Sequence, residues 1–230
     1  MSGIPTGPET PASNLTGIIV AGGRSSRLGQ SKPLTRIGGR LVLARIESAL
    51  RPICDEIILV VRKGQDDDVA ETGLALRMHI VEDNWHDAGP LAGIEAGLAA
   101  TATQLAFATA ADHPFVSSQL ARALADAADC VDLVIPRIAD RMQPLHAVYR
   151  TSVRESMRAD LTAGQFSPLQ FIRNADAAAR VRYFSEDEAR LHDPKLRSFT
   201  DFDTAADLAK VRAMLPRREV IRPDIRPGGV

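Results

Sequence analysis

The sequence reads Leu15-Thr16-Gly17-Ile18-Ile19-Val20-Ala21-Gly22-Gly23 at its first apolar run. A short β-branched run that ends in paired glycines is typical of a buried strand followed by a turn where the backbone can approach a ligand. Similar runs recur along the chain and alternate with segments of helical pattern. The predicted strands cover residues 15–20, 56–61, 78–81, 104–109 and 131–135, and the predicted helices cover residues 41–50, 66–72, 91–99 and 118–128.

Alternation of strands with helices predicts right-handed βαβ units and a parallel sheet. We therefore expect an α/β fold, a three-layer α/β/α sandwich with a mostly parallel sheet. The regular alternation of strands and helices ends after residue 135. Beyond it, residues 145–149 fit a further strand that can run antiparallel to the others. Short strands are predicted at residues 179–184 and 196–199, and helices at residues 151–161, 168–174 and 203–215.

The composition fits one soluble globular domain. The 230 residues carry a net charge of −1, which gives no electrostatic case for binding nucleic acid or a membrane. Two cysteines are too few for a disulfide framework or a thiolate metal site, so we expect a reducing, cytoplasmic location. Nothing resembles a signal peptide or the ~20 apolar residues of a membrane span. We expect a disordered extension at residues 1–14, a domain at residues 15–215 and a disordered tail at residues 216–230.

The segment after the first strand combines glycine with positive charge. Gly22 and Gly23 allow backbone amides to point at a ligand, and Arg24, Arg27 and Lys32 add three cations. Amides and fixed cations are what a triphosphate requires. The sequence contains neither the Walker loop nor the Gly-x-Gly-x-x-Gly dinucleotide fingerprint at this place. A surface loop with solvated basic residues is the alternative, but the coincidence of strand end, glycines and charge favours a phosphate site.

This loop and several later motifs resemble the molybdenum cofactor nucleotidyltransferases, a family with a Rossmann-like fold. The Ala-Gly-Gly form is similar to the guanylyltransferase branch, whereas the cytidylyltransferase branch more often has Ala-Ala-Gly. The similarity spans roughly residues 17–215. The later motifs follow the family's order and read Val81-Glu82-Asp83, Gly89-Pro90-Leu91-Ala92-Gly93, Ala111-Asp112-His113-Pro114-Phe115-Val116, Gln143-Pro144-Leu145-His146-Ala147-Val148-Tyr149 and Asp201-Phe202-Asp203-Thr204-Ala205-Ala206-Asp207-Leu208.

The resemblance implies a role for particular residues within these motifs. The expected catalytic residues are Lys32, Arg27 and Asp112. The expected nucleotide-binding residues are Val20, Ala21, Gly22, Gly23, Arg24, Lys32, Asp83, Gly89 and Asp112. Asp112 and Asp203 would hold Mg²⁺, a hard cation that prefers oxygen ligands. Gln143 and His146 would contact the pterin-containing substrate.

Several of these residues also have a plain structural interpretation. Asp112 and Asp83 can be turn residues, a common use of aspartate. Asp203 precedes a helical pattern, so helix N-capping explains it at least as well as metal binding. His146 has apolar neighbours, and a hydrogen-bonded core histidine is the default there. His113 matches nothing in the family's motif and receives no role.

The implied reaction transfers GMP from GTP to the phosphate of molybdopterin-type cofactor and releases pyrophosphate. A phosphate monoester has a second pKa of ≈ 6, so it is largely dianionic at neutral pH and needs no general base. Two enzymatic alternatives remain, a cytidylyltransferase and a sugar-phosphate nucleotidylyltransferase. A non-catalytic alternative is an accessory protein that binds nucleotide or cofactor. In either case a molybdoenzyme or cofactor-delivery protein would be the expected partner.

Overall fold

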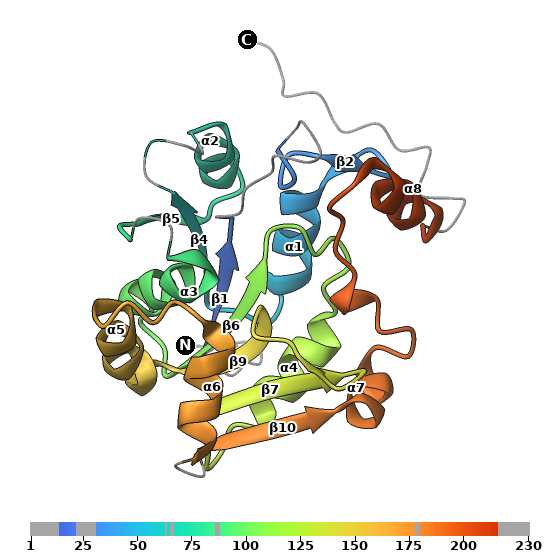
Figure 1. Cartoon of the computed structure of the whole chain (residues 1–230). Helices are drawn as coiled ribbons and strands as arrows, with labels where there is room; N and C mark the ends of the chain where they lie inside the picture. Colours follow the sequence, from blue (N-terminus) through green and yellow to red (C-terminus); the bar gives the residue numbers. More distant parts are fainter. Residues whose placement is uncertain are drawn as a thin grey trace, which may run out of the picture.

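A computed structural model of the chain describes residues 14–21, 31–62, 64, 67–85, 88–177 and 180–215. Its centre is an eight-stranded sheet with helices on both faces (Figure 1). The strands are β1 (Leu15–Val20), β2 (Arg36–Ile37), β3 (Arg40–Leu41), β4 (Glu56–Arg62), β5 (His79–Asp83), β6 (Leu105–Ala110), β7 (Leu133–Ile138), β8 (Arg141–Met142), β9 (His146–Arg150) and β10 (Val181–Ser185). The helices are α1 (Val42–Leu50), α2 (Asp67–Ala75), α3 (Gly89–Ala100), α4 (Ser118–Asp126), η1 (Thr151–Val153), α5 (Arg154–Thr162), α6 (Pro168–Ala177), α7 (Glu186–His192), η2 (Arg197–Phe199) and α8 (Ala205–Ala213).

The main sheet has the order β10-β7-β9-β6-β1-β4-β5, with β8 paired to β7, while β2 and β3 form a separate small sheet. Strands β1, β4, β5 and β6 pair in parallel, as do β7 and β10. Strand β9 runs antiparallel to both of its neighbours, β6 and β7. The predicted α/β fold with a mostly parallel sheet is therefore confirmed, and so is the antiparallel strand predicted near residues 145–149.

Alternating strand residues supply two separate hydrophobic cores, because successive side chains of a strand point to opposite faces. In β1, Ile19 packs with α1 and α4 in one core, whereas Ile18 and Val20 pack with α3 in the other. Helices α3, α5 and α6 cover one face, and α1, α4 and α7 cover the other (Figure 1). Continuous apolar runs of this kind are expected for strands buried on both faces.

Helix α3 approaches β1 closely because it presents glycines to the sheet. A Cβ atom at Gly97 would lie 2.5 Å from Cγ2 of Ile18, and one at Gly93 would lie 2.6 Å from Cγ1 of Val20. Both distances are shorter than real carbon contacts, which lie near ~3.5–4.0 Å. The motif that begins at Gly89 therefore does more than start α3, because its Gly93 also lets the helix pack closely against β1.

The strand predicted at residues 196–199 is wrong, because this segment forms the 3-10 turn η2. Leu196 has a φ of 49°, a left-handed conformation that an extended strand does not contain. The backbone N–H of Ser198 donates to Asp193 Oδ2 at 2.7 Å, and its hydroxyl donates to the carbonyl of Phe115 at 3.3 Å. The hydroxyl bond fastens the segment to the turn after β6, and a side chain rather than a neighbouring strand accepts from the Ser198 N–H.

None of the helices in the described ranges is long and apolar enough to cross a membrane. The predicted N-terminal extension, apart from Asn14, and the predicted C-terminal tail lie outside the described residues.

Candidate active site

Lys32 and Asp112 meet at the carboxyl ends of the central strands. Asp112 follows β6, and the N–H of Ala111 donates to the carbonyl of Val20 at 3.0 Å, which joins the ends of β6 and β1. The ammonium nitrogen Nζ of Lys32 lies 2.8 Å from Oδ2 of Asp112, although the two residues are 80 positions apart. In open α/β sheets this edge is where ligands bind. The predicted convergence of Lys32 and Asp112 is therefore present in the structure.

The turn that carries Lys32 is fastened to the start of α1. The N–H of Thr35 donates to the carbonyl of Lys32 at 3.1 Å, and the hydroxyl of Thr35 donates to the carbonyl of Ser31 at 3.0 Å. The N–H of Leu43, in α1, donates to the carbonyl of Pro33 at 3.0 Å. The lysine thus extends from a closed turn, with its side chain only 15% exposed.

Asp203 completes a triad of charges around Lys32. Its Oδ1 atom lies 2.5 Å from Lys32 Nζ. Helix α8 is capped by Thr204, whose hydroxyl accepts from the N–H of Asp207, while the Asp207 carboxylate accepts from the N–H of Thr204. The N-capping interpretation of Asp203 is therefore wrong, because the neighbouring threonine performs that function. The side chain of Asp203 is 57% exposed and faces the lysine instead.

The carboxylates keep Lys32 protonated. Burial of the ammonium group lowers its pKa, but the hydrogen bonds and charges of Asp112 and Asp203 outweigh burial and raise the pKa above 10.5. Lysine is therefore a cation across the physiological range and balances part of the acidic charge beside it.

The same two carboxylates suit a divalent cation. Both contact a single nitrogen atom, so their oxygens already converge on one positive charge. Mg²⁺ commonly takes one or two carboxylates and completes its coordination with water and substrate phosphates. The donor set of Asp112 and Asp203 fits that pattern.

Asp83 and Gly89 lie on neighbouring elements of the same edge. Asp83 ends β5, and its Oδ1 atom accepts a hydrogen bond from the N–H of Trp85 at 2.8 Å. Burial raises the pKa of Asp83, against the lowering effect of the Trp85 N–H. Gly89 begins α3 with a φ of 66°, and Ala88 before it has no side chain that can cap the helix. The first-turn amides of such a helix are suited to an anion.

The glycine loop can be described only at its borders. Val20 ends β1, and the N–H of Ala21 donates to the carbonyl of Val60 at 2.8 Å. The other loop residues with predicted roles lie outside the described residues; they are Gly22, Gly23, Arg24 and Arg27.

Gln143 and His146, predicted on the substrate side, lie in different surroundings. Gln143 is partly exposed between β8 and β9, and its N–H donates to the carbonyl of Pro136 at 2.9 Å. His146 is 0% exposed, and its ring packs edge-on against Phe107 and Phe199. A side chain with no exposed surface cannot touch a substrate in this conformation, so full burial argues against direct contact by His146.

His113, which received no role from the sequence, lies beside Asp112. Its Nε2 atom is 4.0 Å from Asp112 Oδ1, and its ring centroid is 5.9 Å from that of His146. Burial lowers the pKa of His113, against the raising effect of Asp112 and Asp201, and burial lowers the pKa of His146 well below 6.5. The only sequence signal that could have marked His113 as a site residue was its position directly after Asp112.

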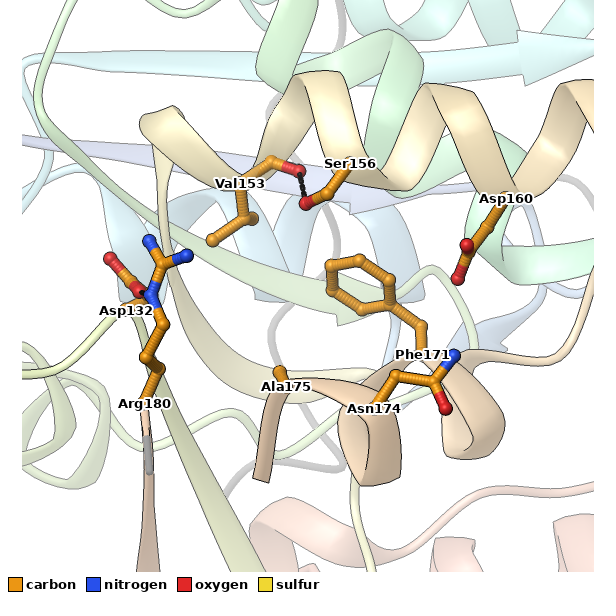
Figure 2. A pocket seen from close by; sticks show the side chains of 8 residues that line it. All are labelled: Asp132, Val153, Ser156, Asp160, Phe171, Asn174, Ala175 and Arg180. Atoms are coloured by element: carbon orange, nitrogen blue, oxygen red, sulfur yellow. Dashed lines mark hydrogen bonds and ion pairs between the residues drawn. The ribbon is translucent and has the colours of Figure 1, made fainter. Parts of the chain in front are cut away.

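A separate pocket of about 180 Å³ lies at the amino-terminal ends of β7 and β10, away from Lys32. Figure 2 shows Phe171 and Val153 pointing into it, with Asp132 and Arg180 at one end. The Asp132 carboxylate and the Arg180 guanidinium form an ion pair there. The pocket lies on the opposite edge of the sheet from the carboxyl ends, so it is not part of the candidate active site.

Comparison with known proteins identifies the family of the chain. The family model described as MobA-like NTP transferase domain matches residues 17–179. A protein from Pelotomaculum thermopropionicum named probable molybdenum cofactor guanylyltransferase is 33% identical over 199 residues, covering 86% of this chain and 92% of the relative.

Two solved structures share the fold. One is titled molybdopterin-guanine dinucleotide biosynthesis protein A from Archaeoglobus fulgidus, with a TM-score of 0.72 and 23% identity over 86% of this chain and 97% of the other. The second is titled 4-diphosphocytidyl-2C-methyl-D-erythritolsynthase from Anaerococcus prevotii, with a TM-score of 0.66 and 20% identity over 86% and 94% of the two chains. With the family model matching residues 17–179 and the Pelotomaculum thermopropionicum relative aligned over most of both chains, the chain is a nucleotidyltransferase and belongs to the MobA-like NTP transferase family.

Proposed function

We propose that the protein transfers GMP from GTP to the phosphate of molybdopterin-type cofactor and releases pyrophosphate. The observation that carries the proposal is the contact of Lys32 with Asp112, 2.8 Å apart at the carboxyl edge of a parallel sheet. A cation and a carboxylate at that position suit a metal-bound triphosphate. The names of the relatives, molybdenum cofactor guanylyltransferases, support the choice of GTP and of the acceptor.

In this proposal the protein acts by positioning and by neutralising charge. Lys32, with Arg27 or Arg24, stabilises negative charge that develops on the triphosphate during transfer. Asp112 and Asp203 would hold Mg²⁺, which would act as a Lewis acid toward the triphosphate. The acceptor phosphate attacks the α-phosphorus of GTP, the bond from that phosphorus to the bridging oxygen breaks, and pyrophosphate leaves.

Other residues at the strand ends would bind the nucleotide and the acceptor. We assign the nucleotide to the loop that begins at Val20 and Ala21 and contains Gly22 and Gly23, together with Asp83 and the amides that follow Gly89. We assign Gln143 to the acceptor side because its side chain is partly exposed. The two cysteines are free, Cys54 buried and Cys130 exposed, which supports a reaction in the reducing cytoplasm.

The test is product analysis. The protein is incubated with molybdopterin-type cofactor, Mg²⁺ and GTP, CTP, ATP or UTP in turn, and the product is identified by mass. The proposal expects a guanine dinucleotide and stoichiometric pyrophosphate with GTP. A cytosine dinucleotide as the main product would contradict the choice of base.

A cytidylyltransferase or sugar-phosphate nucleotidylyltransferase is the second candidate, because the fold is shared with a protein whose title names a diphosphocytidyl product. In the same assay, transfer from CTP, or transfer to a sugar phosphate in place of the pterin, would favour it. Binding of nucleotide without pyrophosphate release from any mixture would favour a cofactor-carrying accessory protein, with a molybdoenzyme as the partner to capture.

A further inference from the structure

Three buried polar side chains lie directly behind Asp112. Thr109 belongs to β6 and is the cross-strand partner of His146 in β9, so both side chains point to the same face of the sheet. His113 follows Asp112, and its ring lies against that of His146. We call His113 and His146 the buried histidine pair.

Several side-chain polar atoms in this cluster make no hydrogen bond within the described residues. Within the described residues, no partner reaches Thr109 Oγ1, His113 Nδ1 or either ring nitrogen of His146. A buried polar atom without a partner costs about 1–3 kcal/mol, so an apolar side chain at these positions would stabilise the fold better. Local rules of core packing are broken most often where a site needs a particular orientation.

Aromatic rings also pack against the pair. The centroid of the His146 ring lies 4.9 Å from that of Phe107 and 4.8 Å from that of Phe199. The centroid of the His113 ring lies 5.9 Å from that of His146. His113 therefore packs beside a fully buried ring that two phenylalanines contact.

The two oxygens of Asp112 face different groups. Oδ2 accepts a hydrogen bond from Lys32, while Oδ1 faces His113 Nε2 at 4.0 Å. That distance is too long for a hydrogen bond. The terminal torsion of an aspartate is soft, so a small rotation of the carboxylate can close the gap.

The tautomer of His113 follows from these surroundings. A neutral imidazole has one N–H donor and one acceptor nitrogen. The nitrogen that faces a carboxylate is the donor, so Nε2 carries the proton. Nδ1 is then the acceptor nitrogen, and within the described residues it has no hydrogen-bond partner.

From this arrangement we propose that His113 is a positioning residue: its Nε2–H donates to Oδ1 of Asp112 when the metal and nucleotide are bound, and His146 fixes the His113 ring for that purpose. The proposal rests on the metal-binding role of Asp112 proposed above. Metal ligands are commonly oriented by a second hydrogen-bonding side chain, and loss of such a partner costs about 10–100-fold in metal affinity or activity.

The test compares three variants by their affinity for Mn²⁺ at saturating GTP, followed by electron paramagnetic resonance. His113→Phe keeps an aromatic ring but has no donor, and we expect it to raise the Kd of Mn²⁺ by about 10-fold or more. His113→Gln keeps an amide donor and is expected to recover most of the affinity. His146→Phe keeps the donor but loosens its support, and a smaller rise is expected.

Two results would overturn the proposal. A folded His113→Phe variant with wild-type Mn²⁺ affinity would mean that the ring only fills space. A folded His113→Gln variant whose Mn²⁺ Kd is raised about 10-fold or more over the wild type would mean that the donor is not what matters. This arm is compared with the wild type, so it also decides the matter if His113→Phe does not fold. Mn²⁺ binding is measured without turnover, so wild-type protein that binds Mn²⁺ and GTP but forms no dinucleotide would refute the proposed function separately.

Discussion

Lys32 contacts both acidic side chains of the candidate site and lies between them. Its Nζ atom is 2.8 Å from Asp112 and 2.5 Å from Asp203, and the carboxylates raise its pKa despite burial. A protonated lysine at this point competes with any cation that seeks the same oxygens. The site is therefore expected to bind a metal well only when a triphosphate draws the lysine away.

A substitution at Lys32 tests this competition. Lys32→Gln should lower the Kd of Mn²⁺ in the absence of nucleotide by about 10-fold or more, because a unit charge at such distances contributes about 1–4 kcal/mol. The turnover rate of the same variant should fall by a factor of about 10²–10³, as expected when one charge-stabilising donor is removed. Isothermal titration with Mn²⁺ measures the first effect, and pyrophosphate release measures the second.

The matched control is Lys195→Gln, which removes an exposed lysine before η2. It should leave both the metal affinity and the turnover unchanged. If Lys32→Gln bound Mn²⁺ no better than the wild type, the lysine would not be competing for the carboxylates.

His146 should make stability depend on pH. Burial lowers its pKa well below 6.5, so the folded state resists protonation while the unfolded chain takes up a proton. The contribution of the neutral His146 ring to the free energy of unfolding is therefore fully present above pH 6.5. As the pH falls below 6.5, the free energy of unfolding decreases by about 1.4 kcal/mol per pH unit. Urea unfolding of the wild type and of His146→Phe between pH 7 and pH 5 should show a shallower decline in the variant. Equal slopes would mean that His146 does not contribute to the pH dependence.

At the scale of elements, the apolar runs predicted the strands well because each is buried on both faces. The expected strands at residues 15–20, 56–61 and 104–109 coincide closely with β1, β4 and β6. The strand predicted at residues 196–199 is wrong because Leu196 and Phe199 are apolar for another reason, namely that they pack against the core beneath α1 and α4. Such tertiary contacts are not visible in a local pattern.

Helix α3 offers a test of element packing. Gly97→Ala would normally favour a helix by about 1 kcal/mol. Here the new Cβ would lie 2.5 Å from Ile18 Cγ2, inside a core where overpacking costs about 1–3 kcal/mol. We therefore expect net destabilisation, measured as a lower urea midpoint with an unchanged slope.

A double-mutant cycle identifies the cause. Ile18→Ala removes the atoms that Gly97→Ala would meet, so the double variant should lose less stability than the sum of the two single variants. Simple additivity would show that α3 does not depend on close approach to β1.

For the molecule as a whole, the sequence predicted which segments meet but not how they touch. Asp112 and Lys32 follow strands, and parallel topology brings strand ends to one edge, so their convergence could be foreseen. The resemblance placed Asp203 beside Asp112, but the local pattern could not decide between this role and a helix cap, because it did not show that Thr204 caps α8. The burial of His146 could not be foreseen, because it requires Phe107, Phe199 and His113 to surround one position.

The most direct measurement is the rate of pyrophosphate release from GTP, with Mg²⁺ and molybdopterin-type cofactor, in Asp112→Asn and in Asp126→Asn. Asp126 is an exposed helical aspartate paired with Arg122, so its loss should leave the rate unchanged. A shared site at Lys32, Asp112 and Asp203 predicts a rate about 10²–10³ lower for Asp112→Asn in protein that remains folded. A folded Asp112→Asn protein that releases pyrophosphate as fast as the wild type would contradict it.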